Sequence, residues 1–194
     1  TTLKSKSELN IDEERISLMM GSNCHVVIYP VNRNKDLNLA CIIRDKKYDP
    51  DNINKLVGKI VSQNNIFEKV LIGDLKSWPL YFTPQILPST NSKVFYIGDA
   101  FNGFLPTLAQ GAGQSIESAY ELFNLIKENK TNIQNTYFQT RLKRAKIVRK
   151  RSNLNFFVFH FSSTFMQSIR NFFIKFLVKR KRFINSYLGT VYKN

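Results

Sequence analysis

Residues 94–114 read VFYIGDAFNGFLPTLAQGAGQ, and the rest of the chain is organised around them. A β-branched and aromatic run leads to Gly98 and Asp99, and a loop that contains Pro106 follows. Three small residues at positions 111–113 then open a pattern typical of a helix. We therefore predict a buried strand over residues 93–97, a ligand loop and a helix N-terminus, all within about twenty residues.

The two ends of this stretch suit different parts of one ligand. Ligands of open α/β sheets gather beyond the carboxyl ends of strands, and a carboxylate there, such as Asp99, suits the hydroxyls of a sugar or polyol. Small residues leave the free N–H groups of a helix start accessible, and these groups favour negative charge, such as the N1 and C2 carbonyl edge of a reduced flavin. The alternatives are a turn capped by Asp99 and a tight turn at positions 111–113 that packs against another element.

The stretch resembles the C-terminal flavin motif of class A FAD-dependent aromatic monooxygenases, which have the para-hydroxybenzoate hydroxylase-like fold. The motif of that family is close to G-D-A-A-H-P-x-x-P-x-x-x-Q-G-x-x-x-x-I-E-D-A, and residues 98–119 keep its spacing without an insertion. Positions that match the family include Asp99, Pro106, Gln110 and Gly111. The positions that replace the usual His, Pro and Asp are Asn102, Gly103 and Ser118.

Other segments are similar to the salicylate hydroxylase and 3-hydroxybenzoate 6-hydroxylase branch of that family. Residues 25–31 (His-Val-Val-Ile-Tyr-Pro-Val) resemble its His-Leu-Val-His-Tyr-Pro-Val strand, and residues 108–112 resemble its Leu-Ala-Gln-Gly-Ala. Nearly all 194 residues find a counterpart, but only in the C-terminal half of the family. The FAD-binding βαβ unit with its glycine fingerprint is missing, so we expect an N-terminal FAD-binding half in the same or a separate chain.

The resemblance implies an enzyme that hydroxylates an aromatic, phenolic or benzoate-like substrate with O2 through a flavin hydroperoxide. FAD is the implied cofactor, and NADH or NADPH is the implied co-substrate. Asp99 would bind the ribityl chain, and the backbone at positions 111–113 would bind the pyrimidine edge of the flavin. The implied cofactor-binding residues are Asp99, Pro106, Gly111, Ala112 and Gly113.

The same resemblance places His25, Tyr29 and Gln110 at the substrate pocket, with His25 and Gln110 as catalytic residues. His25 and Tyr29 lie four residues apart on one predicted strand, so they face the same side. A phenolic substrate must lose its proton to become electron-rich, and a histidine of near-neutral pKa suits a general base. The alternatives are a strand histidine bonded to a neighbour and a sheet aromatic at Tyr29. His160 lies between phenylalanines and is expected to be a core histidine with satisfied hydrogen bonds.

The pattern as a whole predicts the α/β class, or the α+β class if the chain is considered alone as a fragment. We expect an antiparallel substrate-domain sheet, one strand of the FAD-domain sheet and a C-terminal helical region. The expected parts are a substrate-binding portion over residues 1–92, a flavin-contacting part over 93–130 and basic, Phe-rich helices over 131–194. The expected strands cover residues 13–20, 25–30 (stopped by Pro30) and 37–44, with residues 1–11 as a connection.

Hydrophobic periodicity predicts the helices. One begins at residues 49–51, a short one covers 66–72, one runs from 111 to about 128, and one or two lie in 154–178. Thr131 is the expected N-cap of a further helix, which buries Tyr137 and Ala145 and carries Arg141 on its other face.

The net charge of the chain is +15, and its distribution is one-sided. Fourteen Lys and Arg and no Asp or Glu lie from Arg141 to the C-terminus. Such a segment suits an anionic membrane surface or RNA, or it is a solvated face. The second hypothesis is therefore a non-catalytic basic module, or a membrane-associated hydroxylase of the quinone pathway.

The remaining composition narrows the class of protein. The apolar runs are too short for an ordinary transmembrane helix. Cys24 and Cys41 form neither a disulfide framework nor a metal site and are expected to be buried, reduced thiols. We expect a cytoplasmic protein, with a peripheral membrane contact through the basic C-terminus as a further option.

Overall fold

The computed structural model describes residues 2–3, 14–33, 36–45, 53–62, 75–81 and 94–192. The chain divides into two compact units, which are Thr1–Pro79 with Phe157–Ile174 and Leu80–Phe156 with Lys175–Asn194. The sequence predicts a different kind of division, into functional parts that end at residues 92 and 130. That division stays a prediction.

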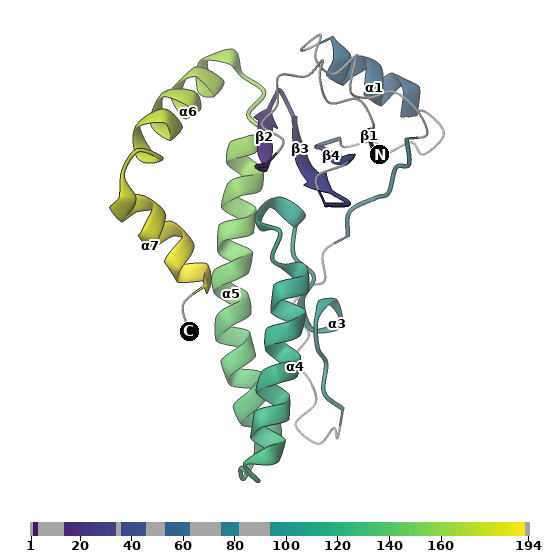
Figure 1. The fold of residues 1–194 in the computed structure, drawn as a ribbon. Helices are drawn as coiled ribbons and strands as arrows, with labels where there is room; N and C mark the ends of the chain where they lie inside the picture. The colour runs from purple at the N-terminus through teal and green to yellow at the C-terminus, as the bar shows by residue number, and fades with distance from the viewer. Residues whose placement is uncertain are drawn as a thin grey trace. The chain divides into compact units, whose positions relative to one another are not determined.

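Four antiparallel strands form the sheet of the first unit, in the order β1-β4-β3-β2 (Figure 1). Their bounds, from β1 to β4, are Thr2–Leu3, Ser17–Met20, Cys24–Val31 and Asp36–Ile43. The pairing of β3 with β4 forms the predicted hairpin, so the expected antiparallel sheet is confirmed. Residues 2–3 are part of the sheet and not of a connection, because they pair with the otherwise open edge of β4.

The prediction that Pro30 ends its strand is wrong by one residue, because β3 continues to Val31. Strand β2 pairs with β3 only as far as the Ser17–Ile28 pair. At Pro30, β3 therefore has a single neighbour among the described strands, which is β4 with Leu37 opposite. A strand tolerates proline where it is paired on one edge only, since the missing N–H then costs no ladder hydrogen bond.

Alternation along the strands divides their side chains between the two faces of the sheet. One face of the sheet packs against helix α1 (Ile53–Val61). Together they form a core whose buried side chains are at most 4% exposed. The buried core residues are Cys24, Val26, Ile28, Leu37, Leu39 and Ile60. The other face of β3 carries His25 and Tyr29. The predicted helix start at residues 49–51 and the helix over 66–72 lie outside the described residues.

Both cysteines are free thiols, as predicted. Burial, together with the neighbouring Cys24, raises the pKa of the Cys41 thiol to about 12. Cys41 therefore stays protonated at neutral pH and is a poor nucleophile.

Residues 94–97 do not form the predicted buried strand. The structure assigns no strand to these residues, and the side chains of Val94, Tyr96 and Ile97 are 54%, 37% and 44% exposed. The physical reason is that a strand of a parallel sheet needs neighbours and covered faces. The described part of the chain offers it neither.

After residues 94–97, the second unit is helical. It contains α3 (Asp99–Asn102), the 3-10 turn η2 (Pro106–Leu108), α4 (Gly111–Lys127) and most of α5 (Ile133–Phe159). Figure 1 shows α4 and α5 side by side as an antiparallel hairpin. The bounds of α4 confirm the predicted helix. Helix α5 begins one residue later than a Thr131 cap would place it.

The inner face of α5 includes two polar residues that the prediction does not place there, Arg141 and Ser152. Its buried residues are Tyr137, Arg141, Ala145, Val148 and Ser152. The prediction that Arg141 lies on the outer face is wrong, because it stands four residues from both Tyr137 and Ala145 and so shares their side of the helix. Its charge is met by carboxylates of α4.

Two further helices follow α5, which are α6 (Thr164–Leu177) and α7 (Lys181–Tyr192). The four phenylalanines of α6, which are Phe165, Phe172, Phe173 and Phe176, are all exposed. None of the helices in the described ranges is both long enough and apolar enough to cross a membrane.

Candidate functional site

Gly98 turns the chain from residues 94–97 into α3 with a φ of +60°, a conformation that favours glycine. A Cβ atom at this position would lie 2.6 Å from Ser115 Oγ on α4. The amides of Phe101 and Asn102 each donate a hydrogen bond of 3.0 Å to the Gly98 carbonyl. These constraints fix Asp99 at the start of α3, against α4.

The structure brings Asp99 and Gly111 together. A Cβ atom on Gly111 would lie 3.9 Å from Asp99 Oδ1, and one on Gly113 would lie 3.7 Å from Gln110 Oε1. Both are ordinary van der Waals distances, so the described part of the chain contains no packing reason for these two glycines. An exposed carboxylate beside open glycine backbone suits a ligand that lies close to the main chain.

The start of α4 is free of capping side chains. Ala109 takes a left-handed φ of 50°, and Gln110 follows as the N-cap residue without a side-chain cap hydrogen bond. The first turn also carries no acidic residue. The backbone N–H groups at positions 111–113 are thus available to an anion. Gln110 is 8% exposed, and its Oε1 accepts a hydrogen bond of 3.5 Å from Gln114.

The loop around Pro106 is tied to α5 through the buried Ser152. Thr107 Oγ1 donates to the Ser152 carbonyl at 2.7 Å, and Ser152 Oγ donates to the Leu105 carbonyl at 2.5 Å. Asn155 Nδ2 donates to the Thr107 carbonyl at 3.2 Å. The backbone is therefore held on both sides of Pro106, which is itself exposed.

Asn102, which stands where the family motif usually has His, is 4% exposed. Its side-chain oxygen accepts a hydrogen bond from Arg149 Nη2 on α5. One charge of the basic C-terminal segment thus supports the loop. An amide oxygen accepts two such bonds but carries no charge of its own, so this contact orients the loop without neutralising Arg149.

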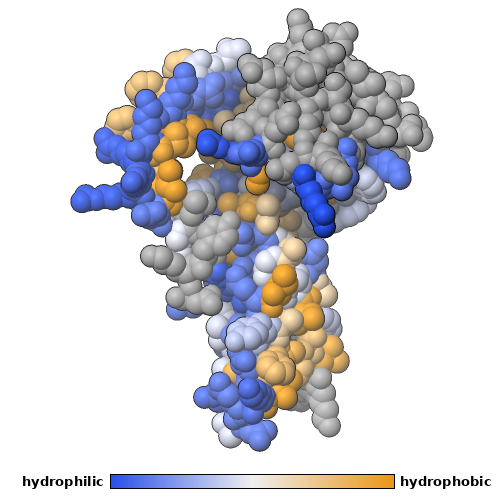
Figure 2. All heavy atoms as spheres, in the orientation of Figure 1, coloured by the Kyte–Doolittle hydropathy of each residue, from blue (hydrophilic) through white to orange (hydrophobic). Residues whose placement is uncertain are grey.

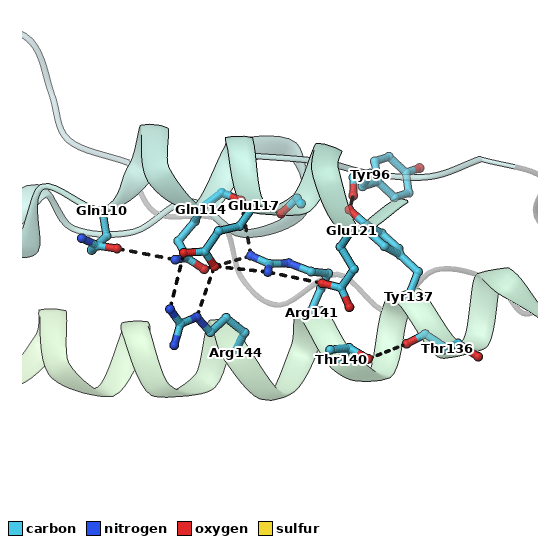
Figure 3. Close-up of polar contacts among 11 residues, drawn as sticks. Tyr96, Gln110, Gln114, Glu117, Glu121, Thr136, Tyr137, Thr140, Arg141 and Arg144 are labelled. Atoms are coloured by element: carbon cyan, nitrogen blue, oxygen red, sulfur yellow. Dashed lines mark hydrogen bonds and ion pairs between the residues drawn. The ribbon is translucent and has the colours of Figure 1, made fainter. Parts of the chain in front are cut away.

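Arg141 lies 5% exposed between α4 and α5 (Figure 3). Its Nη2 donates to the carbonyl and to Oε1 of Gln114 at 3.3 and 2.9 Å. Its Nη1 lies 3.4 Å from a carboxylate oxygen of Glu117 and 3.4 Å from one of Glu121. Because Gln114 also contacts Gln110, a chain of polar contacts connects the buried guanidinium to the first turn of α4.

His25 is 1% exposed and lies on β3. Its Nδ1 is 3.1 Å from His160 Nε2, which also lies 3.3 Å from the Ile42 carbonyl. Desolvation, and secondly the charge of His160, lower the pKa of His25 to about 4, so its imidazole is neutral at neutral pH. The prediction of a buried, hydrogen-bonded His160 is confirmed. The neighbour contact given as the alternative for His25 is present, and its pKa lies below the near-neutral value expected of a general base because the ring is buried. The catalytic role of His25 stays a prediction.

The predicted substrate-pocket residues belong to both units. His25 and Tyr29 are in the first unit and Gln110 is in the second. Tyr29 is half-buried and lies on the same face of β3 as His25, as their spacing predicts. The assembly of these three residues into one pocket stays a prediction. Over the described ranges, no three His, Cys, Asp or Glu side chains gather into a group that could hold a metal ion.

Several contacts that shape this region are absent from the predictions. Arg141 could have been found from its spacing of four from Tyr137 and from Ala145. Ser152 continues the same inner face, so a polar residue at that position signals a hydrogen bond to a neighbouring segment. The contact between Asn102 and Arg149 has no signal in the sequence, because it depends on how the loop lies on α5.

No protein-family model matches the chain. It is 24% identical over 169 residues to 3-amino-4-hydroxybenzoate 2-monooxygenase of Streptomyces platensis, which covers 81% of this chain and 42% of that protein. It is 24% identical over 141 residues to salicylate hydroxylase of Pseudomonas putida, which covers 64% of this chain and 32% of that protein. The crystal structure of a Klebsiella pneumoniae HpxO variant complexed with FAD matches with a TM-score of 0.73 at 14% identity, over 98% of this chain and 52% of that chain.

These comparisons confirm the resemblance to FAD-dependent aromatic monooxygenases. The structural match shows that the two units have the fold found in part of such an enzyme. The chain spans about half the length, or less, of the proteins it matches, which is consistent with the expected C-terminal fragment.

Proposed function

We propose that this chain is part of an FAD-dependent monooxygenase that hydroxylates a phenolic or benzoate-like substrate with O2 and NADH or NADPH. The observation that carries the proposal is the position of Asp99 beside the uncapped, glycine-flanked start of α4. The carboxylate suits the hydroxyls of a ribityl chain, and the row of N–H groups suits the anionic edge of a reduced flavin. The names of the relatives support the same class of reaction.

Bound flavin would supply the electron transfer and the activation of O2. The residues of this chain would bind and orient it: Asp99 accepts hydrogen bonds from the ribityl hydroxyls, and the backbone at positions 111–113 donates to the pyrimidine edge. Pro106 contributes a fixed φ to the loop, and the hydrogen bonds of Ser152 hold that loop before any ligand arrives.

The substrate side of the proposal consists of His25, Tyr29 and Gln110. The Nε2 atom of His25 is the proposed acceptor of the proton of a phenolic hydroxyl, because Nδ1 already lies 3.1 Å from His160 Nε2. The lowered pKa makes His25 a weaker base than an exposed imidazole, and the contact of Nδ1 with His160 offers the proton an exit. Tyr29 contacts the substrate ring, and the Gln110 amide orients it.

A further part of the proposal is an FAD-binding half that covers the outer face of α4. Four apolar side chains on this face, at helical spacing, are 54–71% exposed, and the neighbouring residues 94–97, which form no strand in the structure, include the exposed side chains of Val94, Tyr96 and Ile97. Figure 2 shows a hydrophobic area on this side of the helical hairpin. An apolar helix face beside an apolar segment of β-branched and aromatic residues fits the edge of a parallel sheet. The α4 side chains are Ile116, Tyr120, Phe123 and Ile126.

The test uses the protein encoded by the complete reading frame that contains this chain. We expect it to bind FAD, to oxidise NADH or NADPH faster with one member of a panel of hydroxybenzoates, and to insert oxygen from isotopically labelled O2 into the product. A protein that binds no FAD and oxidises neither nucleotide with any member of the panel contradicts the proposal.

The role of Asp99 has its own test in that protein. Asp99→Ala removes a charged acceptor worth about 1.5–3 kcal/mol, so FAD affinity should fall by tenfold or more. Glu128→Ala, which removes an exposed carboxylate just after α4, is the matched control and should leave FAD affinity unchanged. Equal FAD affinity in Asp99→Ala and the unmodified protein refutes the role of Asp99 but not the class of enzyme.

A further inference from the structure

Helix α6 carries a stripe of exposed phenylalanines. Phe165, Phe172 and Phe176 are 70%, 70% and 49% exposed, and their spacing places them on one line along the helix. Phe173 and Met166, 54% and 38% exposed, lie beside this line. At 3.6 residues per turn, the five side chains cover about a third of the helix circumference. We call these five residues the α6 stripe.

Hydrogen bonds on the other side of α6 hold the stripe outward. Arg170 is 4% exposed, and its Nη1 donates to the carbonyls of Val158 and Phe159 at 3.4 and 3.3 Å. Gln167 Nε2 donates to the Phe161 carbonyl at 3.0 Å. Rotating the helix to bury the stripe would expose these carbonyls and strip a buried guanidinium of its partners, which is costly.

Positive charge is concentrated at the C-terminal end of the stripe. Five exposed cationic residues lie within eight positions, and no acidic residue occurs anywhere from Arg141 to the C-terminus. The Arg180 guanidinium stands 4.1 Å above the Phe176 ring, so the charges adjoin the stripe directly. Figure 2 shows hydrophilic and hydrophobic atoms next to each other over α6 and the turn into α7. The five residues, which we call the basic cluster, are Lys175, Lys179, Arg180, Lys181 and Arg182.

We infer that the α6 stripe and the basic cluster bind the surface of an anionic phospholipid bilayer. The phenylalanines enter the boundary between head groups and acyl chains, and the cationic side chains pair with lipid phosphates. The helix lies in the plane of the interface and does not cross it. This inference is independent of the proposed enzymatic function.

Charge complementarity favours an anionic bilayer on this surface over a second copy of the chain and over RNA. A second copy of the chain would bring its own basic cluster to the same face, and like charges would repel. RNA would neutralise the cluster but would leave most of the α6 stripe uncovered. An anionic bilayer satisfies both features, because it presents phosphate charge and an apolar layer within a few ångströms of each other.

Co-sedimentation of the purified chain with vesicles tests the inference. We expect strong binding to mixed phosphatidylcholine and phosphatidylglycerol, weak binding to phosphatidylcholine alone, and loss of the difference at high salt. The Lys179→Gln/Lys181→Gln double variant should bind about fivefold more weakly for each charge removed. The Phe172→Ser/Phe176→Ser variant should lose binding at every salt concentration.

Control variants show whether the loss of vesicle binding is specific to the α6 stripe and the basic cluster, or follows from any loss of charge or of an exposed apolar side chain. Lys143→Gln/Lys146→Gln removes two exposed charges of α5, and Phe157→Ser removes an exposed phenylalanine of α5, so both should bind like the unmodified chain. Circular dichroism checks that each variant keeps its helix content. Equal binding to both vesicle types, or equal losses in test and control variants, overturns the inference. The inference is also overturned if the protein binds single-stranded RNA but not vesicles, and if this RNA binding needs the lysines but not the phenylalanines.

Discussion

The Nη2 atom of Arg141 lies 2.9 Å from Oε1 of Gln114, and this contact joins α5 to the first turns of α4. The guanidinium is buried, and two half-buried carboxylates of α4 balance its charge. A buried arginine is stable only while such partners remain, because desolvation penalises its charge. The contact therefore couples the packing of the helical hairpin to the start of α4, where the proposed flavin site lies.

Replacing Arg141 should weaken the hairpin. Arg141→Met keeps much of the side-chain volume but leaves Gln114 and Glu121 without their partner, so we expect the free energy of unfolding to fall by about 2 kcal/mol. Urea denaturation followed by circular dichroism measures this. Lys143→Met, an exposed change on the same helix, should shift stability by less than about 0.5 kcal/mol. Equal stability of the two variants would show that the Arg141 contacts contribute little.

Acid should destabilise the chain through His25. Its folded-state pKa of about 4 lies below the ordinary value of 6.5, so between these pH values the unfolded state binds more protons. The contribution of His25 is complete above about pH 6.5, decreases as the pH falls, and should be smaller by about 2 kcal/mol near pH 5. Denaturation at a series of pH values measures it. In His25→Gln the pH dependence should flatten, and an unchanged slope would contradict the assignment.

The loop around Pro106 should loosen when Ser152 is changed. Ser152→Ala removes the donor to the Leu105 carbonyl and a partner of Thr107, at a cost of about 1–2 kcal/mol. Hydrogen–deuterium exchange should show faster exchange over residues 103–109. Ser168→Ala, which removes an exposed hydroxyl of α6, is the control, and its loop should exchange at the unmodified rate. Slow exchange in Ser152→Ala would mean that the loop is held by other contacts.

Two glycines of the central stretch should respond differently to alanine. Gly98→Ala places a Cβ atom 2.6 Å from Ser115 Oγ at a positive φ, so it should destabilise the chain by about 1–3 kcal/mol. Gly111→Ala meets only a 3.9 Å contact and should leave thermal stability almost unchanged. In the complete protein, however, Gly111→Ala should weaken FAD binding. A stable Gly98→Ala, or a Gly111→Ala with normal FAD affinity, would contradict these assignments.

Those features of the helical hairpin that depend on a single helix could be predicted from the sequence. The small residues at positions 111–113 and the apolar spacing after them predict α4 correctly, since both signals are local. The prediction failed for Arg141, because charge alone was taken to mean exposure although its spacing matched that of Tyr137 and Ala145. The identity of its partners depends on which helix packs opposite, and that is a tertiary property.

Sequence by itself determined the strands of the β3–β4 hairpin, helix α4, and the resemblance to flavin monooxygenases, because these follow from local periodicity and from motif spacing. Only the tertiary structure decided that Asp99 lies beside Gly111, that His25 meets His160, and that residues 94–97 form no strand in this structure. Each of these depends on segments distant in sequence, whose meeting is set by the packing of whole elements and by burial. Residues 94–114 depend on both kinds of information. Their sequence predicts a flavin-binding loop, and their contacts with α5 fix the geometry of that loop.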